Sequence, residues 1–77
     1  MGLSERHTAT QHIMQFFAYD HLAEPMQTIS MYSATLAEAM VRDLTDGPEL
    51  TAGLRKLLEA KDCFVRAALP KEAHSGD

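Results

Sequence analysis

Two long stretches with helical periodicity are separated only by Asp46-Gly47-Pro48, and this break constrains the fold more than any other feature. Before it, apolar residues recur at steps of three or four over residues 26–44. After it, Leu54–Arg66 is rich in strong helix formers. Gly47 can take a positive φ as a C-terminal cap, and Pro48 suits the first turn of the next helix. Because so short a connection makes neighbouring helices antiparallel, the sequence predicts a helical hairpin.

The first long helix is expected over about residues 25–45. It begins at Pro25, because proline favours the first helical turn and pushes the preceding Glu24 out of the α region. Several alanines make this helix slim, which suits close packing. Its larger apolar residues form one stripe, which we expect to be buried against the second helix. The members of the stripe are Met26, Ile29, Tyr32, Leu36, Met40 and Leu44.

The second long helix is expected over about residues 48–69, with an apolar face opposite a charged face. The apolar face consists of Leu54, Leu57, Leu58, Val65 and Ala68. The charged face consists of Arg55, Glu59, Asp62 and Arg66. Asp62 and Arg66 have the i,i+4 spacing and the order of a stabilising ion pair. Lys61 lies on or beside the apolar face, where a lysine needs a carboxylate, a phosphate or access to water.

A shorter and weaker helical pattern precedes the hairpin, and we expect a helix there over about residues 8–17. Residues 18–24 should leave the helix before Pro25. Residues 70–77 are expected to form a disordered tail. The sequence thus predicts a single all-α domain over residues 1–77, in which a short N-terminal helix is followed by an antiparallel helical hairpin.

The chain is too short to obtain much stability from its own core. A chain of 77 residues rarely gains more than roughly 3–5 kcal/mol from one core. Its single cysteine, Cys63, excludes an intramolecular disulfide. Two helices cannot enclose a core, so apolar surface remains, and we expect other copies of the chain to cover it in a homo-oligomer. This remaining surface includes Phe16, Phe17, Met31, Met40, Val41 and Phe64.

The net charge of −4 argues against a general binder of long nucleic acids. The charge is uneven, since residues 1–48 carry −4, residues 49–71 carry +2 and residues 72–77 carry −2. The second long helix is thus the basic region, where a small anion can be held. We find neither a secretory signal nor an apolar run of about 18 residues, so we expect a cytoplasmic protein with no membrane partner.

Patterns for metal binding and catalysis are weak. Candidate zinc ligands are His7, His12, His21, His74 and Cys63. They lack the spacing of zinc sites, which favours scattered surface histidines, and we expect neither a metal nor another cofactor. Ser30 and Cys63 fall within expected helices without a nucleophile motif, and no glycine-rich phosphate loop is present. We therefore expect a protein that is not an enzyme.

Two groups of residues are candidates for ligand binding. Tyr19 and His21 lie where the chain leaves the first helix, and each has a flat face and a polar edge suited to a nucleotide base. The apolar residues around them are more often core residues than ligand contacts. The second group lies on the second long helix, where a solvated, salt-bridged face is the more common role. Its basic members are Arg55, Lys56, Lys61 and Arg66.

Taken together, these two stretches resemble a known family. The motifs are Phe16-Phe17-x-Tyr19-x-His21-Leu22 and the run Leu54–Asp62, followed by Arg66-Ala67. They are similar to the phage helical-hairpin proteins that sequester cyclic nucleotide signals, the anti-CBASS sponges, which are related in domain to the Thoeris anti-defence sponges. The resemblance covers roughly residues 13–69, including the turn Asp46-Gly47-Pro48-Glu49.

The resemblance implies a hexamer of helical hairpins in the cytoplasm of a host bacterium. The family binds cyclic dinucleotides between protomers, and often cyclic trinucleotides at a separate site, without degrading them. It thereby lowers the free messenger so that the host effector is not activated. Tyr19 matches the family tyrosine that contacts the cyclic dinucleotide. Arg55 and Lys56 match the basic pair at the head of the second helix, which implies ligand or interface contacts.

The first long helix departs from the family pattern. Relatives tend to carry a basic residue there that meets a ligand phosphate, and residues 29–40 contain none. The nearest candidates are Ser30 and Met31, and the hydroxyl of Ser30 or a cation from another copy can take this role. Lys61 carries a separate hypothesis, an ion pair with a carboxylate of a neighbouring copy. The candidate ligand-binding residues are Tyr19, His21, Ser30, Arg55, Lys56, Lys61 and Arg66.

An alternative function belongs to another class. The chain can be a helical-hairpin interaction protein, whose oligomeric surface binds a host protein through the acidic first long helix. A nucleotide that copurifies with the chain favours the sponge, whereas a copurifying host protein favours this alternative.

Overall fold

The structure, a computed structural model, describes residues 8–69 of the 77-residue chain. Its elements are α1 (Thr8–Met14), the 3₁₀ helix η2 (Gln15–Phe17), α2 (Met26–Asp43) and α3 (Pro48–Ala67). Residues 8–69 contain no strand, so the predicted all-α class is confirmed. The tail expected at residues 70–77 lies outside the described residues.

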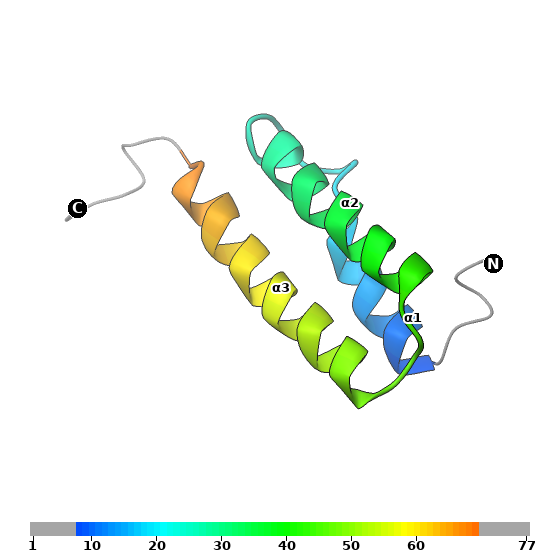
Figure 1. Ribbon diagram of the computed structural model, residues 1–77. Helices are drawn as coiled ribbons and strands as arrows, with labels where there is room; N and C mark the ends of the chain where they lie inside the picture. Colours follow the sequence, from blue (N-terminus) through cyan, green and yellow to red (C-terminus); the bar gives the residue numbers. More distant parts are fainter. Residues whose placement is uncertain (1–7, 70–77) are drawn as a thin grey trace.

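The helices α2 and α3 lie side by side and run in opposite directions, joined at one end by residues 44–47 (Figure 1). Helix α1 lies alongside this hairpin, where α1 contacts α3 and η2 contacts α2. The segment from α1 to η2 therefore covers one side of the hairpin. No helix within residues 8–69 is both long enough and apolar enough to cross a membrane.

Side chains and backbone groups fix the two ends of α2. Before its first turn, one carboxylate oxygen of Glu24 accepts hydrogen bonds from the backbone N–H of Thr28 at 3.1 Å and from its hydroxyl at 2.6 Å. At the other end, the N–H of Leu44 donates to the carbonyl of Met40 at 2.9 Å, and Leu44 itself is extended. A carboxylate at a helix N-terminus is favourable because it meets otherwise unpaired N–H groups.

The connection between α2 and α3 differs from the prediction in one respect. Gly47 has φ 164° and ψ 177°, which is extended backbone. It therefore does not adopt the left-handed conformation in which it was predicted to cap the end of α2. Because Leu44 has already left the helix, Gly47 instead precedes α3, and its carbonyl accepts the N–H of Thr51 at 3.1 Å. Pro48 occupies the first turn of α3, as predicted.

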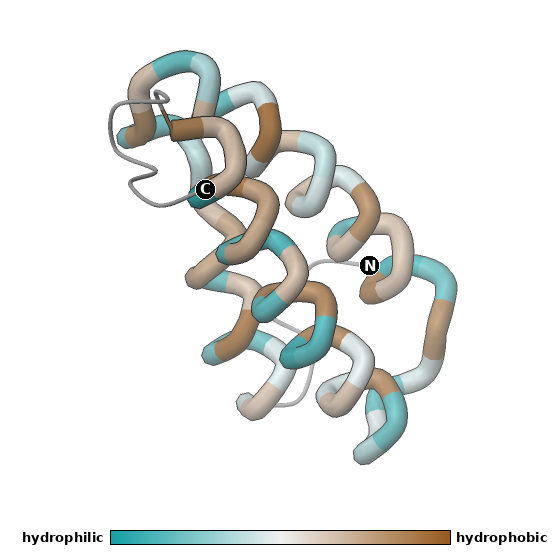
Figure 2. The backbone as a smooth tube through the Cα atoms, turned by 90° about the vertical axis from the view of Figure 1, so that its left-hand side faces the viewer, coloured by the Kyte–Doolittle hydropathy of each residue, from teal (hydrophilic) through white to brown (hydrophobic). Residues whose placement is uncertain are grey.

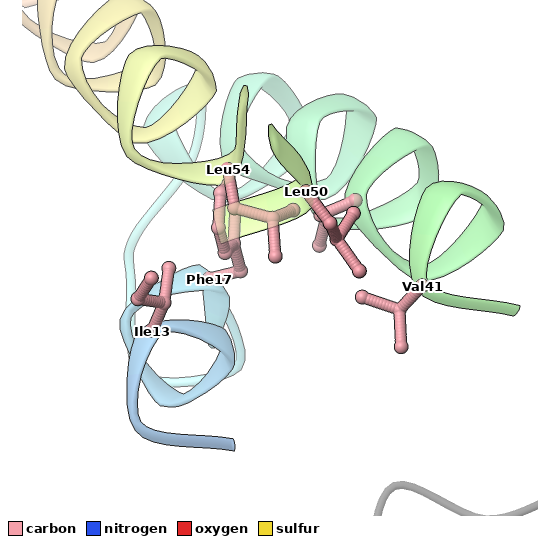
Figure 3. Close-up of a cluster of buried hydrophobic side chains, with 7 residues drawn as sticks. Ile13, Phe17, Val41, Leu50 and Leu54 are labelled. Carbon is pink, nitrogen blue, oxygen red and sulfur yellow. The ribbon is translucent and has the colours of Figure 1, made fainter. Parts of the chain in front are cut away.

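The core lies where α1, η2, α2 and α3 meet (Figure 3). In the close-up, the side chains of Ile13 and Phe17 converge with those of Leu50 and Leu54 from α3 and with Val41 from α2. Ala34 and Ala37 complete the buried cluster. Leu54 is only 2% exposed, which confirms the predicted apolar face of α3 at this position.

The α2 stripe that was predicted to be buried does not form the core. Tyr32, Leu36 and Leu44 are 62, 48 and 47% exposed. The buried side of α2 instead carries small residues, which are Ser30, Ser33, Ala34, Ala37 and Val41. Small side chains let the α2 backbone approach both η2 and α3 closely. The spacing of the large apolar residues identifies a stripe, but it does not identify which neighbouring element covers that stripe. Figure 2 shows hydrophobic segments distributed along the helices.

The remaining apolar surface is also smaller than the sequence predicted. Phe16, Met31 and Phe64 are exposed, as expected. Phe17 and Val41 are buried in the core, because Phe17 lies in η2, which packs against α2. The prediction of exposed apolar surface considered only the two long helices and left out the α1–η2 segment.

Candidate functional site

A cleft of about 330 Å³ lies between the end of the α1–η2 segment and the C-terminal half of α3, with Ser30 contributed by α2. We call it the η2–α3 cleft. Its lining consists of Gln15, Phe16, Ala18, His21, Leu22, Ser30, Lys61, Asp62, Val65 and Arg66. Four of the seven predicted ligand-binding residues come together here, namely His21, Ser30, Lys61 and Arg66.

Ser30 is the unusual residue of this cleft. It has no exposed surface, and its hydroxyl has no hydrogen-bond partner among the described residues. A buried hydroxyl without a partner costs on the order of 1–3 kcal/mol in proteins, which is why such groups are rare. Ser30 is held at this position because it belongs to the small-residue side of α2, which packs against the rest of the fold. Its hydroxyl therefore retains unused hydrogen-bonding capacity among the described residues.

Lys61 is tied to a backbone group rather than to a distant carboxylate. Its Nζ donates a 2.9 Å hydrogen bond to the carbonyl oxygen of Phe16, and it lies 3.9 Å from the carboxylate of Asp62. The side chain is only 12% exposed. Phe16 lies near the C-terminal end of the short helix η2. Carbonyl groups at such an end can lack a partner within the helix, and a cation near them is favourable. Within the described chain, the partners of Lys61 are this carbonyl and the carboxylate of Asp62, and the ion pair with a neighbouring copy stays a prediction.

Arg66 closes the far side of the cleft and is exposed. Its Nη2 donates to the Sγ of Cys63 at 3.4 Å, one turn earlier on α3. The predicted ion pair between Asp62 and Arg66 is not formed within the described residues, where Asp62 pairs with Lys61 instead. Most of the guanidinium donors of Arg66 are thus directed to water or to a ligand.

The rim of the cleft is aromatic as well as basic. His21 is exposed on the connection between η2 and α2. The half-exposed ring of Phe16 is met edge-on by His12, with ring centroids 5.4 Å apart and an angle of 79° between the rings. These rings and the apolar side chains of Leu22 and Val65 provide surfaces on which a flat group can pack.

Three predicted site residues lie outside the η2–α3 cleft. Tyr19 is half-buried and packs against the core cluster, and its role in ligand binding stays a prediction. Arg55 and Lys56 are exposed on α3 and do not line the cleft. His7 and His74, which were considered as zinc ligands, lie outside the described residues.

Sequence reasoning missed two acceptor groups of the site. The carbonyl of Phe16 and the carboxylate of Asp62 both lie near the ammonium of Lys61. The only signal for them was the position of Lys61 beside an apolar face, which required some partner but did not identify it. The carboxylate of Asp62 offsets one of the two positive charges that Lys61 and Arg66 bring to the cleft.

An exposed ion pair lies outside the cleft. At the end of α2, the guanidinium of Arg42 donates to both carboxylate oxygens of Asp43, at 2.9 and 3.2 Å. These hydrogen bonds lower the pKa of Asp43 from its usual value and raise that of Arg42. Both residues are exposed and lie outside the cleft, so Arg42 is a suitable control cation for experiments on the site.

The described residues of the cleft supply donors but no arrangement for covalent catalysis. The hydroxyl of Ser30 has no base within hydrogen-bond distance among them. A buried hydroxyl, an ammonium and a guanidinium are instead the groups that bind an anion such as a phosphate.

The chain matches no protein-family model, no curated protein and no solved structure.

Proposed function

We propose that this chain is a phage anti-defence protein that binds cyclic oligonucleotide second messengers in the η2–α3 cleft and withholds them without degrading them. The observation that carries the proposal is the buried Ser30 hydroxyl, which lacks a partner in a cleft that also holds Lys61 and Arg66. A phosphodiester brings the acceptor oxygens that these donors need, and charge-assisted hydrogen bonds to phosphate are among the strongest in proteins.

The same donors can replace the basic residue that the resembled family carries in the first long helix and that α2 lacks. In the proposed complex, Ser30 contacts the phosphate from α2, while Lys61 supplies the positive charge from α3. An ammonium has three N–H donors, and the Phe16 carbonyl accepts from one of them. Lys61 can therefore bind a phosphate without giving up its place in the fold.

The bases of the ligand would pack at the rim. Base stacking on aromatic side chains contributes about 1–3 kcal/mol per base. His21 and Phe16 offer ring faces there, and Leu22 and Val65 offer apolar contacts. Because these contacts do not depend on base identity, the proposal extends to cyclic dinucleotides as a class, and cyclic trinucleotides belong to it through the family resemblance.

A second copy would complete the site. Ligand pockets usually enclose about 300–1,000 Å³, and the cleft of about 330 Å³ is at the lower end of this range. Our proposal therefore includes assembly of several copies, with the hexamer of the resembled family as the expected form. Tyr19, Arg55 and Lys56 lie outside the cleft, so the ligand contacts expected of them would be made from a neighbouring copy.

Isothermal titration of the full chain with a panel of cyclic di- and trinucleotides tests the proposal. We expect at least one ligand to bind, and chromatography of the mixture should recover it intact. Arg66→Gln should weaken binding at least about fivefold, since hydrogen bonds between ions contribute about 1.5–3 kcal/mol. The matched control, Arg42→Gln, removes a cation outside the cleft and should leave the dissociation constant unchanged.

Two results would count against the proposal. The absence of binding to every member of the panel removes it, and equal losses for the Arg66 and Arg42 variants would indicate a diffuse charge effect. Copurification from bacteria provides a further comparison. Absorbance near 260 nm from a small molecule supports the sponge, whereas a stoichiometric host protein without nucleotide supports the interaction-protein alternative.

A further inference from the structure

Asp62 lines the η2–α3 cleft but carries a carboxylate, which is not a group that binds an anion. Its side chain is 53% exposed, whereas that of Lys61 is 12% exposed and Ser30 has no exposed surface. The cleft therefore has a deep end with Ser30 and Lys61 and an outer end with Asp62 and Arg66. Because a carboxylate repels a phosphate, the outer end suits a part of the ligand that donates hydrogen bonds.

The oxygens of the Asp62 carboxylate accept no hydrogen bond from residues 8–69. The Nζ of Lys61 is 3.9 Å from Oδ1, an ion pair too long for a hydrogen bond. Arg66 follows four residues later on α3, a spacing that favours an ion pair, yet its Nη2 donates to the Sγ of Cys63 at 3.4 Å. A carboxylate and a guanidinium thus lie on one wall of the cleft without bonding to each other.

Such a pair of charged groups can recognise a flat ligand edge on which two donors lie next to an acceptor. Guanine has this edge, because its N1–H and one of its N2–H groups point in the same direction and its O6 oxygen lies beside them. A carboxylate can accept the two N–H groups in parallel, as it does from the fork of an arginine. The O6 oxygen can then accept from Arg66, whose guanidinium has several N–H donors besides the one directed to Cys63.

The other common bases do not match this pair of groups. Adenine and cytosine each have an acceptor nitrogen beside the amino group, so one oxygen of the carboxylate would face a lone pair. Uracil has a single N–H between two carbonyl oxygens. The carboxylate that accepts from guanine therefore repels part of the edge of each other base, and such a repulsive element is a common source of specificity.

We propose that the η2–α3 cleft selects guanine among the bases of its ligand, with the N1–H and N2–H groups bonded to Asp62 and O6 bonded to Arg66. The inference rests on the proposed function and deepens it. The rings of Phe16 and His21 can pack against any base, whereas Asp62 adds a contact that distinguishes between bases. Hydrogen bonds to a charged group are stronger than those between neutral groups, so a guanine ligand should bind at least about tenfold more tightly than an adenine ligand.

Titration of the full chain with three cyclic dinucleotides of the same ring linkage tests the inference. The three ligands carry two guanine, two hypoxanthine or two adenine bases. Hypoxanthine differs from guanine only in lacking the 2-amino group, so it removes one of the two hydrogen bonds to Asp62. We expect affinity to decrease in the order guanine, hypoxanthine, adenine, with at least about tenfold between the first and the last.

Asp62→Asn separates base selection from the general effect of charge. Loss of a negative charge raises the affinity of every anionic ligand, so the ratio of guanine to adenine affinity is the quantity to compare. This ratio should fall below about threefold, because an asparagine amide offers one acceptor and one donor, a pattern that adenine also matches. Glu59→Gln is the matched control, since it removes an exposed carboxylate of α3 outside the cleft and should leave the ratio unchanged.

The possible outcomes separate this inference from the proposed function. Equal affinities of the wild type for the guanine and adenine ligands overturn the inference and leave the proposed function standing. A guanine preference that persists in Asp62→Asn overturns it as well, because another group would then recognise the base. If none of the three ligands binds, the inference falls, and the wider ligand panel then decides whether the proposed function falls with it.

Discussion

Lys61 joins α3 to the end of η2 through a 2.9 Å hydrogen bond from its Nζ to the carbonyl oxygen of Phe16, 45 residues earlier in the chain. The bond has two consequences. It satisfies a carbonyl at the end of a short helix, and it places an ammonium at the wall of the η2–α3 cleft. Stability and the proposed ligand binding therefore involve the same side chain, and experiments on Lys61 must separate the two.

Lys61→Met should lower the stability of the unliganded chain. The substitution keeps the unbranched stem of the side chain without its ammonium and removes the hydrogen bond to the Phe16 carbonyl, so we expect a loss of about 1 kcal/mol. For a chain of this size that corresponds to a decrease in Tm of about 4–8 °C. Thermal unfolding followed by circular dichroism measures it. Lys56→Met, at an exposed position of the same helix, should change little, and an equal or higher Tm for Lys61→Met would show that the bond is dispensable.

Ser30→Ala should have opposite effects on stability and on binding. Without ligand, it removes a buried hydroxyl that lacks a partner, so the free energy of unfolding should rise by about 1 kcal/mol. With a cyclic dinucleotide, the proposed contact to phosphate is lost and affinity should decrease. Urea unfolding and titration of the same preparation measure both. Thr35→Ala, on the exposed side of α2, controls for helix propensity. If Ser30→Ala destabilises the unliganded chain, its hydroxyl has a partner in the fold.

Thr10→Val tests how α1 is attached to the hairpin. The buried hydroxyl of Thr10 donates to the carboxylate of Asp46 at 3.0 Å, which links α1 to the connection between α2 and α3. Valine keeps the shape of threonine but cannot donate, so we expect a loss of about 1–2 kcal/mol in urea unfolding. Thr8→Val, at an exposed position of the same helix, should be neutral. Equal stabilities of the two variants would mean that packing alone holds α1 in place.

Tyr19 and His21 should respond differently to substitution by alanine. Tyr19 packs against the core cluster, so Tyr19→Ala should cost about 1–3 kcal/mol of stability, whatever its effect on binding. His21 is exposed at the rim of the cleft, and His21→Ala should change stability by less than about 0.5 kcal/mol. His21→Ala is therefore the cleaner test of an aromatic ligand contact. Titration with a cyclic dinucleotide should show weaker binding at an unchanged Tm.

Gly53→Ala should stabilise α3. A glycine within a helix costs roughly 0.5–1 kcal/mol relative to alanine, and the added methyl group meets no atom within 4 Å. The unfolding midpoint in urea should therefore rise. A decrease would contradict this prediction and would indicate that the added methyl group is not accommodated beside Gly53.

The positions of the helices follow closely from local sequence signals. The hairpin was predicted with breaks at Pro25 and around residues 46–48, and α2 and α3 occupy Met26–Asp43 and Pro48–Ala67. Proline and glycine act on the backbone directly, so their effects can be read without knowledge of the fold. The end of α2 at Leu44 could not be read in this way, since the extended residues after it are set by the connection to α3.

The orientation of α2 and the partners of the polar residues were harder to predict. The large apolar residues of α2 indicate a stripe, but Ala34 and Ala37 form the buried side because α1 and η2 occupy the space next to them. Lys61 required a partner, yet the partner is a backbone carbonyl at Phe16, which carries no signal in the sequence. In both cases the missing information is which segments meet in space, and this is set by the whole chain.

Ala37 has no exposed surface, whereas its neighbour Leu36 is about half exposed. Adjacent positions on α2 therefore tolerate opposite kinds of change. At Ala37 the limit is volume, since even one added methylene must displace a neighbouring helix. At Leu36 the polarity of the side chain matters instead. A charged group there leaves the fold intact and changes only what can bind to the surface. The packing within the fold and the chemistry of its surface can thus be adjusted separately, one residue apart.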